Sequence, residues 1–244
     1  MRNHRYMTAP PALALVHSPL VGPLTWTPTA ARLRRLGYPV VVPSLAGVVA
    51  GGPPYHARLA KAAARAVDSA HPAGQVVLVA HSAAGALLPG VADALAGRAT
   101  AAVFVDAMLP YAGASWWDIA PVEQRAELSR LVREGRLPPW NEWFPASAVA
   151  ALLPQADLRG RFVAELPEIP LDYFEEAAPS AAAWPPASGC GYLRLSEPYE
   201  AAARRAEQLG WLVDRWDADH LAMLTEPEKA ATLIARMVEA VAAG

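Results

Sequence analysis

Short runs of apolar residues alternate along the chain with longer segments whose apolar residues recur at helical spacing. The runs contain few polar residues, which is typical of parallel strands that are buried on both faces. We expect strands at residues 12–16, 40–42, 76–80, 101–105, 191–195 and 211–216. We expect helices at residues 27–36, 53–70, 83–96, 199–209 and 227–241. This alternation predicts an α/β fold, with a mostly parallel sheet of about six strands covered by helices on both faces.

Local signals mark the course of two of these helices. Thr27 and Pro28 fit the N-cap and the first position of one helix, and Gly37 ends it. Pro89 lies inside the segment 83–96, where it has no N–H to donate to the Gly85 carbonyl. We therefore expect that helix to bend at Pro89.

The alternation stops between Asp106 and about Pro186. Residues 110–186 are predicted to form an insertion, and residues 1–109 and 187–244 to form the core of the fold. The insertion has short helical patterns at 122–134 and 146–153. Two interpretations of the insertion are compatible with each other: a structural subdomain with its own core, and a lid over an apolar pocket. Five of the eight tryptophans of the chain lie in it: Trp116, Trp117, Trp140, Trp143 and Trp184.

Composition and charge narrow the classes of partner. The 244 residues carry a formal net charge of −2 without a basic stripe, which argues against nucleic acid. A single cysteine, Cys190, excludes an intramolecular disulfide and cysteine-rich zinc motifs. Residues 1–11 lack the apolar stretch of a secretory signal or membrane anchor, so we expect a cytoplasmic protein without a membrane partner. We expect a small-molecule substrate and a monomer or homodimer.

The predicted strand at 76–80 runs directly into His81, Ser82 and a segment of small residues. A strand that turns sharply into a helix at a serine is the pattern of a nucleophile elbow. The flanking residues of an elbow are small because strand and helix nearly touch there, and Ala80 and Ala84 occupy those positions. A serine that merely caps the helix is the alternative interpretation.

Polar residues follow several of the predicted strands, at the edge of a parallel sheet where ligands bind. Ser82 and Asp106 lie at the centre of this edge, and His220 follows the last strand. The chain order serine, acid, histidine is that of the α/β-hydrolases. A serine hydroxyl is a weak nucleophile, so a histidine must accept its proton and a carboxylate must orient that histidine.

The chain resembles the α/β-hydrolases, and among them the plant-type esterase and hydroxynitrile lyase branch. Residues 16–26 match the oxyanion loop, residues 80–84 the elbow, and residues 218–224 the segment of the catalytic histidine. The resemblance extends over nearly the whole chain outside the insertion. It implies an α/β-hydrolase fold with a helical lid before the last two strands, Ser82 as the nucleophile and His220 as the general base.

Two residues compete for the role of the acid. In the plant-type branch the acid follows the penultimate strand, where this chain has Glu197 in place of the usual aspartate. Asp106 follows the strand at 101–105, where some other α/β-hydrolases place their acid. We favour Asp106, because Glu197 also fits a first-turn carboxylate of the next helix.

The oxyanion loop departs from the family pattern. Family members use the N–H of the residue after the nucleophile, here Ala83, and a second N–H at the position of Pro19, which has none. Loss of one such donor typically lowers turnover by about 10²–10³. Ser18 also replaces the glycine that normally follows the histidine of this loop. The N–H of Leu20 or the hydroxyl of Ser18 would have to replace the missing donor.

These features favour a serine hydrolase that cleaves an ester, thioester or lactone with an apolar group through Ser82, His220 and Asp106. Pro19 favours an alternative, a lyase or cyclase that uses the same acid/base pair, and a catalytically inactive ligand-binding module is the third possibility. We expect no cofactor and no metal, because neither metal-ligand spacing nor a phosphate-binding loop occurs. The predicted pocket residues are His17, Pro19, Leu20, Met108, Trp116, Trp117, Trp140 and Trp143.

Overall fold

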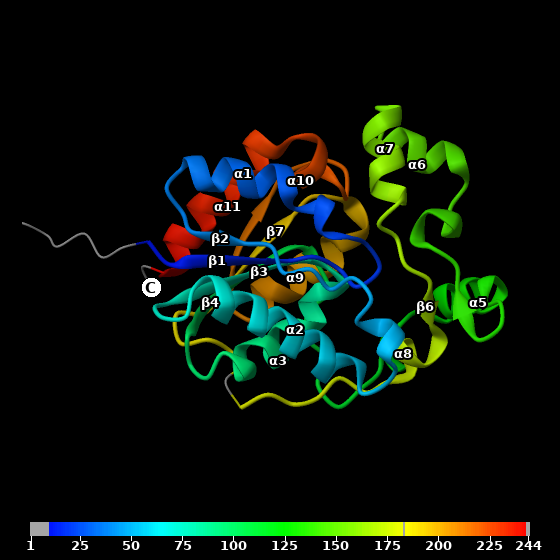
Figure 1. Cartoon of the computed structure of the whole chain (residues 1–244), viewed down its shortest axis with the longest axis horizontal. Helices are drawn as coiled ribbons and strands as arrows, with labels where there is room; N and C mark the ends of the chain where they lie inside the picture. The colour runs from blue at the N-terminus through cyan, green and yellow to red at the C-terminus, as the bar shows by residue number, and fades with distance from the viewer. Residues whose placement is uncertain (1–9, 183, 243–244) are drawn as a thin grey trace, which may run out of the picture.

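A six-stranded sheet forms the centre of the computed structural model, which describes residues 10–182 and 184–242 (Figure 1). Its strands lie in the order β2-β1-β3-β4-β7-β8, and each neighbouring pair is parallel. The predicted α/β fold with a parallel sheet of six strands is therefore confirmed. The strands are β1 (Ala12–Val16), β2 (Val40–Val41), β3 (Val76–Ser82), β4 (Ala99–Ala107), β7 (Cys190–Arg194) and β8 (Leu212–Arg215).

Helices bury both faces of the central strands β1, β3 and β4. Successive residues of each strand point to opposite faces. Leu13 and Leu15 of β1 pack with one set of helices, and Ala14 and Val16 pack with the other. The first set is α1 (Thr27–Arg35), α10 (Ala222–Thr225) and α11 (Pro227–Ala242), and the second is α2 (Tyr55–Ala70), α3 (Leu88–Ala94) and α9 (Glu200–Gln208) (Figure 1). In the described ranges no helix has the length and apolar character needed to cross a membrane.

Two of the local helix signals act differently from the sequence expectations. The segment 83–96 is not one bent helix, because the 3-10 helix η3 (Ala83–Leu87) precedes α3 and Pro89 lies in the first turn of α3. Proline is accepted there because the first N–H groups of a helix have no partner within the helix. Thr27 is the first residue of α1 rather than its N-cap, and its hydroxyl donates to the Pro23 carbonyl at 3.0 Å.

The insertion between β4 and β7, called the lid segment below (residues 110–186), is a group of short elements at one side of the sheet (Figure 1). Its elements α4, α7, α8, β5 and β6 were not predicted, because each is too short to show a clear period. They are α4 (Trp116–Ile119), α5 (Val122–Leu131), β5 (Arg136–Leu137), η4 (Trp140–Trp143), α6 (Ala146–Leu152), α7 (Ala156–Val163), β6 (Ile169–Pro170) and α8 (Leu171–Glu175); outside it lie η1 (Pro23–Thr25), η2 (Val49–Gly51) and η5 (Glu197–Tyr199).

Two glutamates attach the lid segment to the core of the fold. Glu165 accepts a hydrogen bond from the Leu24 N–H at 2.8 Å, in the loop that follows β1. Glu176 accepts hydrogen bonds from the N–H groups of Tyr55 and His56, each at 2.7 Å, at the start of α2. A carboxylate is favourable at a helix start, because the N–H groups there lack helical partners and form the positive end of the helix dipole.

Gly85 allows the elbow to lie directly against the chain that follows β4. A Cβ at this position would lie 1.9 Å from the carbonyl oxygen of Met108, a backbone atom. We expect Gly85→Ala to lower the free energy of unfolding by about 1–3 kcal/mol, the usual cost of overpacking. Thermal unfolding measures this effect. Gly160→Ala is the matched control, because its Cβ would have no atom within 4 Å; equal stability of the two variants would contradict the prediction.

Candidate active site

Ser82 ends β3 at a sharp turn into η3. Its backbone has φ 57° and ψ −131°, a conformation that residues other than glycine rarely adopt. Ala80 and Ala84 are completely buried on either side of the turn, as the close packing of an elbow requires. Ala83 begins η3, so its N–H is not used within that helix. The local structure is thus a strand-turn-helix elbow with Ser82 at its tip.

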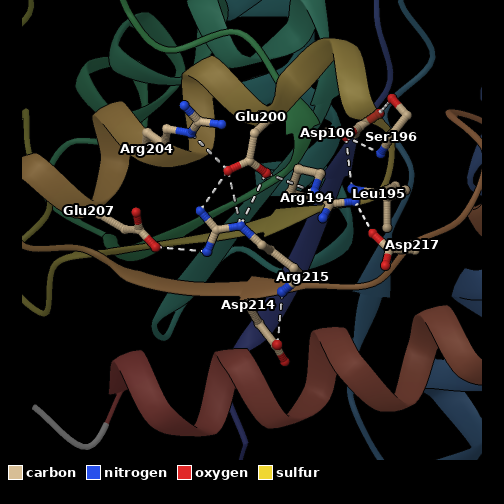
Figure 2. A network of polar contacts seen from close by, with 10 residues as sticks. All are labelled: Asp106, Arg194, Leu195, Ser196, Glu200, Arg204, Glu207, Asp214, Arg215 and Asp217. Carbon is tan, nitrogen blue, oxygen red and sulfur yellow. Dashed lines mark hydrogen bonds and ion pairs between the residues drawn. The ribbon is translucent and has the colours of Figure 1, made fainter.

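Asp106 and His220 form the central pair of the site. Asp106 Oδ2 lies 2.7 Å from His220 Nδ1, and the Asp106 side chain is completely buried. The carboxylate also accepts hydrogen bonds from the N–H groups of Leu195 (2.8 Å) and Ser196 (3.0 Å) and from the Ser196 hydroxyl (2.5 Å) (Figure 2). Burial by itself would raise the pKa of Asp106, but the hydrogen bonds from His220 and Ser196 lower it overall. Asp106 therefore holds His220 as an ionised carboxylate.

Glu197, the other candidate acid, lies at the start of η5 and is exposed. The Nδ1 atom of His220 bonds to Asp106 instead. The geometry therefore favours Asp106 over Glu197 as the group that orients the histidine.

His81 supports His220 from a second side. Its Nε2 donates a hydrogen bond to the His220 carbonyl oxygen at 2.9 Å, and the two rings lie 4.4 Å apart between centroids. Burial, followed by repulsion from a positive charge on His220, lowers the pKa of His81 well below its ordinary value, so its ring stays neutral. The sequence placed His81 near the site without a role; its role depends on a contact with a loop 139 residues later in the chain.

Tyr199 is the residue that the sequence reasoning missed. Its hydroxyl shares a hydrogen bond of 3.3 Å with Ser82 Oγ. Its ring stacks on the His220 ring, with the centroids 5.0 Å apart and the planes 5° apart. Ser82, Tyr199 and His220 thus form one cluster beside Asp106. One feature of the sequence could have identified Tyr199. It follows a predicted strand, and so lies at the carboxyl edge of the sheet with the other polar site residues.

His17 has a structural role in the loop after β1. It is completely buried, its Nδ1 donates to the Ser18 carbonyl at 2.8 Å, and its Nε2 accepts from the Leu45 N–H at 3.1 Å. Burial lowers its pKa to about 4, so the ring is neutral near pH 7. Because both ring nitrogens are occupied, the prediction that His17 lines the substrate pocket is corrected: His17 braces the loop.

In the same loop the two candidate replacement donors bond to each other. The Leu20 N–H donates to the Ser18 hydroxyl oxygen at 3.2 Å, and both residues are buried. The donor of Leu20 is therefore engaged inside the loop. Pro19 lies between them without an N–H. The Ser18 hydroxyl only accepts in this bond, so its role as an oxyanion donor, like that of the Ala83 N–H, stays a prediction.

The remaining predicted pocket residues lie around the elbow and in the lid segment. The Met108 N–H donates to the Ser82 carbonyl at 3.0 Å, which places the start of this loop against Ser82. The four lid tryptophans are partly buried and pack on other aromatic rings, as in the pair of Trp116 with Phe174 and the pair of Trp140 with Phe162. Their contact with a substrate stays a prediction. Within the described chain, no three His, Cys, Asp or Glu residues are grouped as a metal site.

The comparisons with known proteins cover almost the whole chain. A family model described as the alpha/beta hydrolase family matches residues 13–242. No curated protein sequence matches. Among solved structures, an extracellular alpha/beta-hydrolase from a Paenibacillus species, described as sharing structural and functional homology with tobacco salicylic acid binding protein 2, is 21% identical. It has a TM-score of 0.75, and the match covers 93% of this chain and 99% of that one.

Two plant-type enzymes are also similar in fold. Polyneuridine aldehyde esterase is 18% identical with a TM-score of 0.70, and the match covers 93% of this chain and 99% of that one. Tomato methylketone synthase I, solved as a variant with β-ketoheptanoate, is 17% identical with a TM-score of 0.68, and the match covers 96% and 100%. At this level of identity the likeness concerns the fold, which agrees with the resemblance to the plant-type branch.

Proposed function

The chain belongs to the alpha/beta hydrolase family and is an enzyme of the hydrolase class, and we propose that it cleaves a carboxylic ester, thioester or lactone through Ser82, His220 and Asp106. The observation that carries this proposal is the bond of 2.7 Å between buried Asp106 and His220, beside the strained elbow of Ser82. The aromatic packing of the lid segment supports a substrate with an apolar group.

Each residue has a defined task in the proposed reaction. His220 takes the proton of Ser82 as Oγ attacks the carbonyl carbon, and returns it to the leaving alcohol or thiol. The Asp106 bond keeps a proton on His220 Nδ1, which leaves Nε2 free to accept. A water molecule then attacks the acyl-enzyme with His220 again as the base. The N–H of Ala83 is the donor to the oxyanion in both steps.

An active-site serine probe tests the proposal. A fluorophosphonate is expected to label the wild-type protein at Ser82 and to label Ser82→Ala not at all. Turnover of p-nitrophenyl esters of increasing acyl length then reports how apolar the preferred substrate is. Absence of both labelling and ester turnover in folded protein would overturn the proposal.

A second candidate is non-hydrolytic acid/base chemistry, a lyase or cyclase reaction with Ser82 and His220. Pro19 favours it, because such a reaction needs no complete oxyanion hole. The hydrogen bond of Ser82 to Tyr199 also fits a proton-transfer site. In the fluorophosphonate experiment this candidate predicts no labelling and no ester turnover.

Pro19→Ala separates the two candidates further. The variant restores an N–H, and a hydrogen bond to the developing oxyanion is worth about 3 kcal/mol in a preorganised site. We expect a gain of about tenfold in p-nitrophenyl acetate hydrolysis, a discounted part of that maximum because the loop is shaped around proline. Pro28→Ala, in the first turn of α1, is the control that should leave the rate unchanged. An unchanged rate in a Pro19→Ala protein whose structure aims the new N–H at Ser82 would contradict the prediction.

A further inference from the structure

Tyr199 approaches Ser82 from the side of β3 opposite to the oxyanion loop. In the sheet, β1 and its loop lie on one side of β3, and β4, β7 and β8 lie on the other. The oxyanion loop with Pro19 follows β1, whereas Tyr199 follows β7 and His220 follows β8. Ser82 therefore has the proline loop on one side and the Tyr199 hydroxyl, at 3.3 Å, on the other.

The Tyr199 ring is held in a fixed position against His220. The stack of the two rings is nearly parallel, so the hydroxyl at the end of the tyrosine ring projects past the imidazole to Ser82 Oγ. Tyr199 is also the residue directly before α9, and its neighbour Glu200 is the first residue of that helix. The position of Tyr199 thus depends on the anchoring of Glu200.

A network of ion pairs anchors Glu200 and the loop of His220 to each other (Figure 2). Arg194, at the end of β7, donates to Glu200 at 3.2 Å and to Asp217 at 2.6 Å, and its side chain is only 12% exposed. Asp217 lies three residues before His220. Arg215 adds a second cation on Glu200, at 3.0 Å. Arg194 therefore connects the segment that carries Tyr199 to the segment that carries the general base.

The Tyr199 hydroxyl is a donor at the pH where a serine hydrolase works. Burial raises its pKa to about 12, although the hydrogen bond with Ser82 lowers it in part and the charge of Asp106 adds to the increase. The group accordingly keeps its proton near neutral pH and can donate a hydrogen bond to a neighbouring oxygen.

We propose that Tyr199 is a further catalytic residue, whose hydroxyl donates a hydrogen bond to Ser82 Oγ while that oxygen carries developing negative charge. The proposal rests on the proposed function. In acylation the Ser82 O–H bond breaks, the proton moves to His220 Nε2, and the Oγ–carbon bond forms. In deacylation the carbon–Oγ bond breaks and Oγ takes a proton back from His220. Tyr199 keeps its own proton throughout, and acts in both steps because Oγ carries charge in both.

This role stabilises the nucleophilic oxygen and is separate from the oxyanion donor that Pro19 lacks. A bond of 3.3 Å is long for two hydroxyls, and catalytic hydrogen bonds often tighten only in the complex with substrate. The tightening is favoured as Oγ becomes more negative, because hydrogen bonds to charged acceptors are shorter and stronger. Tyr199 therefore contributes more to the transition state than to the ground state, which is the condition for catalysis.

Tyr199→Phe tests the proposal, because it removes the hydroxyl and keeps the ring on His220. We expect kcat/KM for p-nitrophenyl acetate, and the rate constant of fluorophosphonate labelling, to fall by about 10- to 100-fold. This loss is no larger than the loss that follows removal of one oxyanion donor. The labelling rate reports the attack of Ser82 without a deacylation step. The melting temperature should stay at the wild-type value. Tyr38→Phe is the matched control, because that hydroxyl bonds to Glu239 on the exposed surface and should leave both rates unchanged.

Tyr199→Ala supplies the second comparison, since it removes the ring as well as the hydroxyl. A loss shared equally by Tyr199→Phe and Tyr199→Ala assigns the effect to the hydroxyl. Unchanged or faster rates in Tyr199→Phe, with a wild type that is labelled and active, would overturn the role of Tyr199 and leave the serine hydrolase intact. A wild type that is neither labelled nor active would overturn the proposed function itself.

Discussion

Ser82→Ala is expected to lower ester turnover by about 10⁶-fold, the loss measured when a serine protease loses its nucleophile. The proposed reaction forms its covalent bond at Ser82 Oγ, and no other hydroxyl is placed on the elbow. The fold should survive, because Ser82 is only partly buried and its side chain does not fill the core. His220→Ala should have an effect of similar size, since it removes the base.

Purified variants, assayed with p-nitrophenyl acetate and by thermal unfolding, measure both parts of this prediction. Ser129→Ala is the control, because its hydroxyl donates to the Arg125 carbonyl within an exposed helix of the lid segment. It should retain wild-type turnover. A Ser82→Ala enzyme with near wild-type turnover of the true substrate would show that the nucleophile assignment is wrong.

The sequence predicted those parts of the fold and candidate site that depend on strand ends. Ser82 and Asp106 come at the ends of runs of apolar residues, and His220 follows the last predicted strand. The carboxyl ends of parallel strands meet at one edge of the sheet. A linear pattern therefore predicts their proximity without any knowledge of side-chain contacts. The choice of Asp106 over Glu197 follows the same logic, because Asp106 lies near the carboxyl end of a central strand while Glu197 starts a 3-10 turn and is exposed.

The residues that were missed or misassigned depend on turns and on long-range contacts. Tyr199 was assigned to the start of a helix, but η5 (Glu197–Tyr199) intervenes and turns its ring onto His220. His17 was assigned to the pocket because of its neighbours in sequence, whereas its contact with Leu45 buries it. The N–H of Leu20 was a candidate oxyanion donor, but it bonds to Ser18 inside the loop. Patterns of apolar residues carry no information about such contacts.

Asp106→Asn is expected to lower turnover by about 10⁴-fold by stabilising the wrong tautomer of His220. The structure gives the reason. Asp106 Oδ1 accepts the N–H groups of Leu195 and Ser196, so an asparagine would keep its oxygen there and place its NH₂ group where Oδ2 now faces His220. The His220 Nδ1 would then accept instead of donate, its proton would move to Nε2, and Nε2 could no longer take the proton of Ser82.

The stability of the variant distinguishes this mechanism from unfolding. Asp106→Asn should keep a melting temperature close to that of the wild type, because the two backbone hydrogen bonds to its oxygen remain. Glu197→Gln is the matched control, an exposed carboxylate of the competing position, and should change turnover little. If Glu197→Gln lowers turnover more than Asp106→Asn, the acid is Glu197. The Asp106→Asn substitution leaves Ser82 and Tyr199 unchanged. Its residual rate therefore measures how much of the catalysis depends on the tautomer of His220.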